Sequence, residues 1–331
     1  MNVVQLKNPR GARRAAAVDG RTLHVFRDYP SAYALALSAI ERREKLSVLI
    51  ASAAIESELG YDAVYDGDSE WKLLPAFDHP DEPGRCLVCG TGLTHLQSAQ
   101  NRQNMHAGAK EETDSMKMYR WGLDGGRPRS GSIGVQPEWF YKGTGRILRA
   151  HGEALTVPAF GESGGEEAEV AAAYVIDGTG TPRRVGFMTA NEFSDHVMEA
   201  RNYLYLAPSK LRECAIGPEL VVDGDFSSLS GKVQIDRDGA VLWNAELKTG
   251  DANMSHTLEN LEHHHFKYAA HRDPGDVHIY FFGAGAFSSG AGIRLQHGDE
   301  MSIEFSGWGR ALKNKVAVSE RSDRLCRAVP L

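Results

Sequence analysis

The chain has 331 residues, of which 42% are hydrophobic and 24% are charged, so it can bury one large core or two moderate ones. Its 37 basic residues against 44 acidic ones leave a net charge of -7, which excludes a general attraction to nucleic acids or anionic membranes. No apolar run approaches the roughly 20 residues that span a bilayer, and the first residues lack the apolar core of a secretory signal. We therefore expect a cytoplasmic protein with neither a nucleic-acid nor a membrane partner.

The first 80 residues predict a small α+β cap domain. Polar and apolar residues alternate over residues 3–6 and 15–18, a turn follows at Asp19-Gly20, and a further strand pattern covers residues 22–26. This is the pattern of a β-hairpin. Apolar residues then recur with helical spacing from Ser31 to Gly60, where the glycine predicts the end of the helical region.

The remainder of the chain predicts a larger, β-rich domain over residues 84–331. The proline-rich and acidic stretch 74–84 breaks both helix and strand and marks the boundary. Beyond it, short apolar runs alternate with glycine-rich turns, at residues 170–176, 185–190, 220–222, 233–235, 241–243, 277–282 and 301–305. The clearest helices cover residues 193–206 and 258–270. Strands outnumber helices, so a doubly wound nucleotide-binding fold is disfavoured.

Two metal-like patterns have simpler interpretations. Cys86 and Cys89 form a C-x-x-C, but no second pair completes a zinc site, and we expect reduced, buried thiols on a strand. The run His263-His264-His265 lies in a predicted helix, where consecutive side chains point about 100° apart and cannot chelate one ion from a single face. We therefore expect this run to lie on a helix surface, with one of the three imidazole rings packed against the rest of the protein.

The densest acidic candidate is Glu166-Glu167-Ala168-Glu169, which leads into an apolar strand. Because strand side chains alternate, Glu167 and Glu169 project together while Glu166 points away. Two converging carboxylates repel unless a cation neutralises them, and hard oxygen ligands suit Mg²⁺ or a similar divalent ion. Glu192, where a later strand meets a helix, is the candidate third ligand. The alternatives are a solvated acidic strand end and, for Glu192, charge compensation at a helix start.

A set of motifs in this order resembles the fumarylacetoacetate hydrolase superfamily. The matching residues are Glu167-Ala168-Glu169, Ala190-Asn191-Glu192-Phe193-Ser194, Ser209-Lys210, Gly217-Pro218, Pro274-Gly275-Asp276-Val277, and the tail from Gly298-Asp299 to Asn314. The resemblance covers roughly residues 84–318, and the ordered set is far more specific than any one motif. Within the superfamily, residues 113–118 and 138–142 resemble the sugar-acid branch.

The resemblance implies an α+β fold class, with the N-terminal cap followed by a mixed β-roll, and a homodimer. It also implies a Mg²⁺ site, or one for Ca²⁺ or Mn²⁺, at Glu167, Glu169 and Glu192 that chelates a small-molecule 2-oxo acid substrate. Three positions depart from the superfamily pattern. Glu192 replaces the usual aspartate, His196 stands where an arginine is usual, and Gly283-Ala284-Gly285 lacks the usual threonine.

The resemblance also places Lys210 beside the metal, where an ammonium group can stabilise developing negative charge or move a proton. Its alternative is a surface ammonium. We expect replacement of Lys210 by methionine to lower kcat while leaving thermal stability nearly unchanged. The acid/base candidates are His95 and His106, which titrate near neutrality. No His/Glu pair aligns in that region.

These observations favour a metal-dependent lyase that dehydrates a 2-keto-3-deoxy sugar acid of the pentonate class. The alternative enzyme is a hydrolase that cleaves a carbon–carbon bond in a 2,4-dioxo acid. Elimination needs no attacking water, so the missing His/Glu pair favours the lyase. A third hypothesis is a non-catalytic protein that binds sugar acids.

Overall fold

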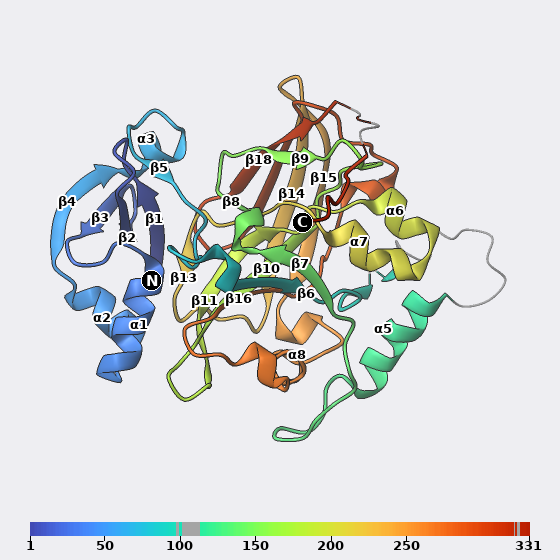
Figure 1. Cartoon of the computed structure of the whole chain (residues 1–331), viewed down its shortest axis with the longest axis horizontal. Helices are drawn as coiled ribbons and strands as arrows, with labels where there is room; N and C mark the ends of the chain where they lie inside the picture. Colours follow the sequence, from blue (N-terminus) through green and yellow to red (C-terminus); the bar gives the residue numbers. More distant parts are fainter. Residues whose placement is uncertain (97–98, 101–112, 321, 323–324) are drawn as a thin grey trace.

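The computed structural model describes residues 1–96, 99–100, 113–320, 322 and 325–331. Its described part is mostly β-sheet with short helices, as the sequence predicts (Figure 1). The strands are β1 (Asn2–Lys7), β2 (Arg13–Asp19), β3 (Thr22–Phe26), β4 (Ile55–Gly60), β5 (Lys72–Leu73), β6 (Cys86–Gly90), β7 (Phe140–Thr144), β8 (Leu148–Arg149), β9 (Leu155–Val157), β10 (Ala168–Ile176), β11 (Pro182–Asn191), β12 (Cys214–Ile216), β13 (Leu220–Val221), β14 (Leu229–Arg237), β15 (Ala240–Thr249), β16 (Val277–Phe281), β17 (Glu300–Phe305) and β18 (Leu312–Val318).

The α-helices are α1 (Ala32–Arg42), α2 (Leu46–Ser52), α3 (Tyr61–Tyr65), α5 (Asp114–Gly125), α6 (His196–Arg201), α7 (Leu206–Lys210) and α8 (Leu258–Phe266). Each is too short or too polar to cross a bilayer, and this holds for every helix in the described ranges. The helices lie around the sheets, with α1 and α2 beside the N-terminal strands and α6 and α7 on the opposite side of the molecule (Figure 1).

Thirteen of the described strands form one sheet. Its main order is β4-β3-β2-β1-β13-β11-β10-β16-β6-β7, and β5, β8 and β12 pair at its sides. The N-terminal strands join it because β1 pairs with β13, with Asn2 opposite Val221. Strands β15-β14-β17-β18-β9 form a second sheet. The sheet is continuous across the boundary that the sequence predicts, and the division at residues 80–84 stays a prediction.

Strand β10 is buried on both faces, which explains its unbroken apolar sequence. Ala171, Ala173 and Val175 pack into a core shared with α1 and α2. The alternate residues, such as Val170 and Tyr174, pack into a core shared with the second sheet and α8. Strand β10 therefore lies between two cores, and its N-terminal end is held by both of them.

Three helical predictions are wrong in part. Residues 55–60 form strand β4 instead of helix, because α2 ends at Ser52 and the chain becomes extended at Ala53, after which β4 pairs with β3. The predicted helix at 193–206 begins only at His196, since Ser194 still pairs with Gly165 as an extension of the sheet. Helix α8 ends at Phe266 instead of residue 270 and is followed by a separate short turn.

The interpretation of the cysteines as buried thiols is confirmed for Cys86 and Cys89, which are free and face the two different cores from β6. In the histidine run, two rings are packed where one was expected. His264 and His265 are both buried on α8, and His265 stacks on Tyr280.

Candidate metal centre

The pairing of β10 with β11 brings three glutamates to one face of the sheet. Glu169 lies in β10 opposite Ala190, and the backbone N–H of Glu192 donates to the carbonyl of Glu167 at 3.0 Å. Glu167 and Glu192 are therefore direct cross-strand neighbours, and Glu169 follows two residues along the same face. One carboxylate oxygen from each lies within 4.8 Å of the others. All three side chains are buried.

Two buried lysines contact this cluster. Lys210 Nζ donates to Glu167 Oε1 at 2.6 Å and Glu192 Oε2 at 2.9 Å. Lys142 Nζ, from β7, donates to Glu192 Oε1 at 2.7 Å. Both lysine side chains are fully buried. The alternative that Lys210 is a surface ammonium group is therefore wrong.

The pKa values of the three carboxyl groups are shifted in different directions from their ordinary value. Burial and the neighbouring Glu192 and Glu167 carboxylates raise the pKa of Glu169 well above its ordinary value. Burial opposes ionisation of Glu167 as well, but the Lys210 ammonium and His196 hold its pKa well below the ordinary value. Burial also raises the pKa of Glu192, against the opposite effect of the two lysines. Of the three carboxyl groups, Glu169 is thus the one whose surroundings most favour the protonated form when no cation is present.

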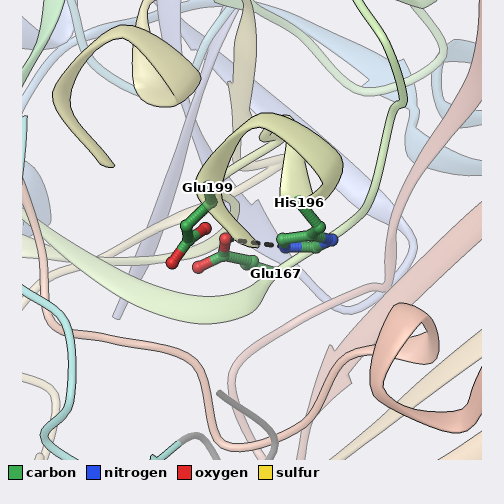
Figure 2. Close-up of side chains that lie close together, drawn as sticks. All are labelled: Glu167, His196 and Glu199. Atoms are coloured by element: carbon green, nitrogen blue, oxygen red, sulfur yellow. Dashed lines mark hydrogen bonds and ion pairs between the residues drawn. The ribbon is translucent and has the colours of Figure 1, made fainter. Parts of the chain in front are cut away.

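Helix α6 adds two further groups to the cluster (Figure 2). Asp195 caps the helix by accepting the N–H of Met198 at 3.1 Å, and the first turn then directs His196 and Glu199 toward Glu167. His196 Nε2 lies 2.9 Å from Glu167 Oε1. Glu199 Oε2 lies 3.9 Å from Lys210 Nζ. Both side chains are buried.

This donor set fits a divalent cation. Glu169 Oε1 is a buried oxygen that has no hydrogen-bond partner among the described residues, although its Oε2 accepts the N–H of Gly283 at 2.8 Å. When ionised, the four glutamates joined by these contacts exceed the two ammonium groups by two negative charges. Such an excess is costly in a buried site, and one divalent cation would neutralise it.

The structure separates the other candidates from the cluster. Glu166 points away, as predicted, and accepts the N–H and the hydroxyl of Ser288. His95 is buried between the Thr94 and Thr249 hydroxyls, at 2.9 and 3.1 Å, and burial lowers the pKa of His95 to about 4. His106 lies outside the described residues.

His95 lines a cavity of about 650 Å³ between β14, β15 and the turn at Gly285. None of the clustered glutamates is among the described residues that line it. The turn that contains Gly283 and Gly285 separates the two regions, since Gly283 donates its N–H to Glu169. No contact between His95 and the carboxylates is present in the described structure, so its role as an acid or base stays a prediction.

Sequence reasoning missed Lys142, His196 and Glu199 as parts of the cluster. Lys142 falls in the stretch 138–142 that resembles the sugar-acid branch, but the sequence contains no sign of its contact with Glu192. His196 attracted notice only as the replacement of an arginine. The sequence does contain a signal for His196 and Glu199 as a pair, because they are three residues apart in a predicted helix and such residues share one face.

Comparisons with known proteins find dehydratases of sugar acids among the proteins that the chain resembles. No family model matches the chain. A segment is 33% identical over 120 residues to 2-dehydro-3-deoxy-D-arabinonate dehydratase of Saccharolobus solfataricus, covering 35% of this chain and 39% of that protein. Another match is 27% identical over 237 residues to a probable 2-keto-3-deoxyxylonate dehydratase of Haloferax volcanii, covering 69% of this chain and 71% of that protein.

Solved structures extend the similarity to nearly the whole chain. 2-Keto-3-deoxy-D-arabinonate dehydratase, complexed with magnesium and 2,5-dioxopentanoate, superposes with a TM-score of 0.72 at 21% identity, over 97% of this chain and 100% of that one. The chain has the fold of the fumarylacetoacetate hydrolase superfamily. A 5-carboxymethyl-2-hydroxymuconate delta-isomerase from Mycobacterium smegmatis superposes with a lower TM-score of 0.58 at 14% identity, over 96% of this chain and 100% of that one. The resemblance to the sugar-acid branch is therefore confirmed.

Proposed function

We propose that this protein is a divalent-metal-dependent lyase that dehydrates a 2-keto-3-deoxy sugar acid of the pentonate class. The observation that carries the proposal is the buried cluster of Glu167, Glu169 and Glu192 with Lys210 at its centre. Both sequence relatives are named as dehydratases of such acids, and the solved relative was complexed with magnesium and 2,5-dioxopentanoate. Loss of water from a 2-keto-3-deoxypentonate, followed by rearrangement, gives that compound.

In this proposal, Glu167, Glu169 and Glu192 hold the cation, with Mg²⁺ as the expected ion and Ca²⁺ or Mn²⁺ as alternatives. Bound there, the ion supplies a Lewis acid that makes the C3 proton of a 2-oxo acid more acidic. Gly283 fixes Glu169 through its N–H at 2.8 Å, and Asn191 Oδ1 accepts the N–H of Glu167 at 3.3 Å. The ligand set is thus held by two rigid strands and a turn.

Lys210 is the proposed catalytic group for the developing negative charge. Its Nζ donates to Glu167 and Glu192 and makes a third hydrogen bond to Ser194 Oγ at 3.1 Å. The ammonium group also lies 5.1 Å from the centre of the Phe140 ring. These contacts fix its position without solvent, where a charge stabilises an adjacent oxyanion more strongly than in water. His95 or His106 is the proposed base for the C3 proton.

The hydrolase alternative has one observation in its favour. His196 lies beside Glu167, and Glu199 lies near both, so a histidine and a carboxylate adjoin the centre even though none aligns near His95. Such a pair can activate a water molecule. A non-catalytic sugar-acid-binding protein is the third possibility and would bind ligand without turnover.

One experiment separates these functions. The purified protein, loaded with Mg²⁺, is incubated with a panel of 2-keto-3-deoxy acids and 2,4-dioxo acids, and the products are identified by mass. Dehydration gives one product that is lighter than its substrate by one water, whereas hydrolysis gives two fragments from a dioxo acid. Saturable binding with no product from either group would favour the binding protein.

We further propose that the protein is a cytoplasmic homodimer with an N-terminal cap, residues 1–80, and a catalytic domain, residues 84–331. Free thiols at all four cysteines are consistent with a reducing compartment. Phe160 and Leu204, 73% and 80% exposed, are apolar side chains of the kind that interfaces cover. Light scattering of the eluting protein tests the dimer, cell fractionation tests the compartment, and limited proteolysis near residue 80 tests the boundary.

A further inference from the structure

A second set of metal-ligating atoms adjoins the proposed magnesium site and shares one residue with it. Glu167, His196 and Glu199 each offer one ligand atom, and these atoms lie within 4.8 Å of one another (Figure 2). His196 and Glu199 come from the first turn of α6, three residues apart, so they face Glu167 together. All three side chains are buried.

Neighbouring residues hold the His196 imidazole in place. The His196 ring stacks on Phe287, with the ring centres 5.1 Å apart, and a Cβ at position 165 would collide with the ring, so Gly165 leaves the space that it fills. His196 Nε2 stands 2.9 Å from Glu167 Oε1. Two atoms bound to one ion at roughly 2.1 Å, at a right angle, lie roughly 3 Å apart. The existing separation therefore suits shared coordination with little movement.

The two sets differ in chemistry. Glu167, Glu169 and Glu192 offer only oxygen atoms, which suit Mg²⁺ and Ca²⁺. The set with His196 offers a nitrogen atom, and imidazole favours transition metals such as Co²⁺ and Zn²⁺. When ionised, the four clustered glutamates (Glu167, Glu169, Glu192 and Glu199) exceed the ammonium groups of Lys142 and Lys210 by two charges, which one divalent ion neutralises. A second ion would leave the cluster positively charged.

We propose that the centre binds one divalent ion in either of two overlapping positions that share Glu167. The oxygen position, with Glu169 and Glu192, holds Mg²⁺ or Ca²⁺. The nitrogen position, with His196 and Glu199, holds a transition-metal ion. The kind of ion thus decides whether it sits against β10 and β11 or against α6. This inference rests on the proposed metal centre and adds to it a second, metal-selective position.

The test measures the binding of Mg²⁺ and of Co²⁺ to the chelator-treated protein by calorimetry. In the wild type each ion binds once per chain, and either one displaces the other. His196→Asn lowers the affinity for Co²⁺ by about 100-fold and that for Mg²⁺ by at most a few fold. Glu169→Gln does the reverse. His278→Asn is the matched control, because it removes another buried imidazole and leaves both affinities unchanged.

A spectroscopic readout makes the test independent of affinity. In the Co²⁺-loaded wild type, the ring N–H proton of a coordinated histidine gives a strongly shifted proton resonance, and this signal disappears in His196→Asn. Simultaneous binding of both ions would overturn the overlap. An equal loss of Mg²⁺ and Co²⁺ affinity in His196→Asn would mean that His196 merely orients Glu167. Failure of Mg²⁺ to bind the wild type, with Co²⁺ bound through His196, would instead overturn the proposed magnesium centre and the oxygen position with it, and would leave the nitrogen position standing.

Discussion

Replacement of Glu169 by glutamine should separate the stability of the metal-free protein from its affinity for the metal. Burial and two neighbouring carboxylates raise the pKa of Glu169 well above its ordinary value, so we expect the group to hold its proton when no ion is bound. Glutamine has the shape of that neutral form. Its side-chain oxygen can still accept the Gly283 N–H, which Glu169 accepts at 2.8 Å.

The expected magnitudes follow from this difference. In chelator, the free energy of unfolding of Glu169→Gln should match that of the wild type within about 1 kcal/mol, the scale of one hydrogen bond. Loss of a charged ligand should weaken Mg²⁺ binding by at least about 100-fold, which is about 2.7 kcal/mol. At a Mg²⁺ concentration about 100 times the wild-type Kd, the wild type gains about 2.7 kcal/mol of stability and the variant only about 0.4.

The assay is urea unfolding with chelator and again with Mg²⁺, together with turnover of the sugar acid. Glu166→Gln is the control, because Glu166 is an adjacent buried carboxyl group that faces Ser288 instead of the cluster. It should keep the full stabilisation by Mg²⁺. The reasoning is refuted if Glu169→Gln is stabilised by Mg²⁺ as much as the wild type. A loss of several kcal/mol in chelator would show that Glu169 is ionised in the metal-free protein.

Three further predictions concern the pH dependence of Mg²⁺ binding, the buried Lys210, and Tyr61 in helix α3 of the N-terminal region. Because the folded-state pKa of Glu169 lies above its unfolded value, its contribution to the stability of the metal-free protein is present at low pH and lost as pH rises toward the folded pKa. Mg²⁺ binding releases that proton, so the Mg²⁺ affinity measured by calorimetry should rise by about tenfold per pH unit while Glu169 remains protonated. A Mg²⁺ affinity that does not change with pH would contradict this. Lys210→Met should lose about 3–5 kcal/mol in chemical unfolding as well as activity, because it leaves the buried Glu167 without its ammonium partner and Glu192 with Lys142 alone. Unchanged stability would mean that these contacts are weak. Tyr61→Phe removes a buried hydroxyl of helix α3 that donates to Glu219 at 2.8 Å and should cost about 1 kcal/mol without changing the Mg²⁺ affinity. A change in that affinity would show that α3 acts on the centre.

The Lys210 prediction differs from what the sequence suggests. From sequence alone, a methionine at that position was expected to leave stability nearly unchanged. The structure corrects this, because the Lys210 side chain is fully buried and joined to two glutamates. The motif around Lys210 indicates the chemistry of the side chain. The burial of Lys210 depends on packing between α7 and β7, which the sequence does not show.

Strand alternation correctly predicts that Glu167 and Glu169 point to one side and Glu166 to the other. The position of Glu192 depends on the register of β10 against β11. Near the turn Tyr174 pairs with Arg184, but Ala173 pairs with Gly186, so a β-bulge shifts the register by one residue. Without that shift, Glu192 would project from the opposite face. Short-range patterns do not reveal the bulge, so the order of the motifs is the better guide to Glu192 as the proposed third ligand.

The strands of the larger domain were predictable because their apolar runs are bounded by glycine-rich turns. The strand at residues 55–60 was not, since most of its residues are exposed and its extended form depends on pairing with β3. The contact of Lys142 with Glu192, 50 positions apart in sequence, and the place of His196 beside Glu167 likewise depend on tertiary packing. Patterns within a short stretch of sequence do not predict contacts between distant residues.

The most direct test of the central claim is the mass of the product formed from a 2-keto-3-deoxypentonate by the Mg²⁺-loaded protein. We expect a single product that is lighter than the substrate by one water, carries an aldehyde, and is absent after chelation of the metal and in Glu169→Gln. If the sugar acid persists unchanged while a 2,4-dioxo acid is cleaved into two fragments, the protein is a hydrolase and the proposed dehydration is wrong.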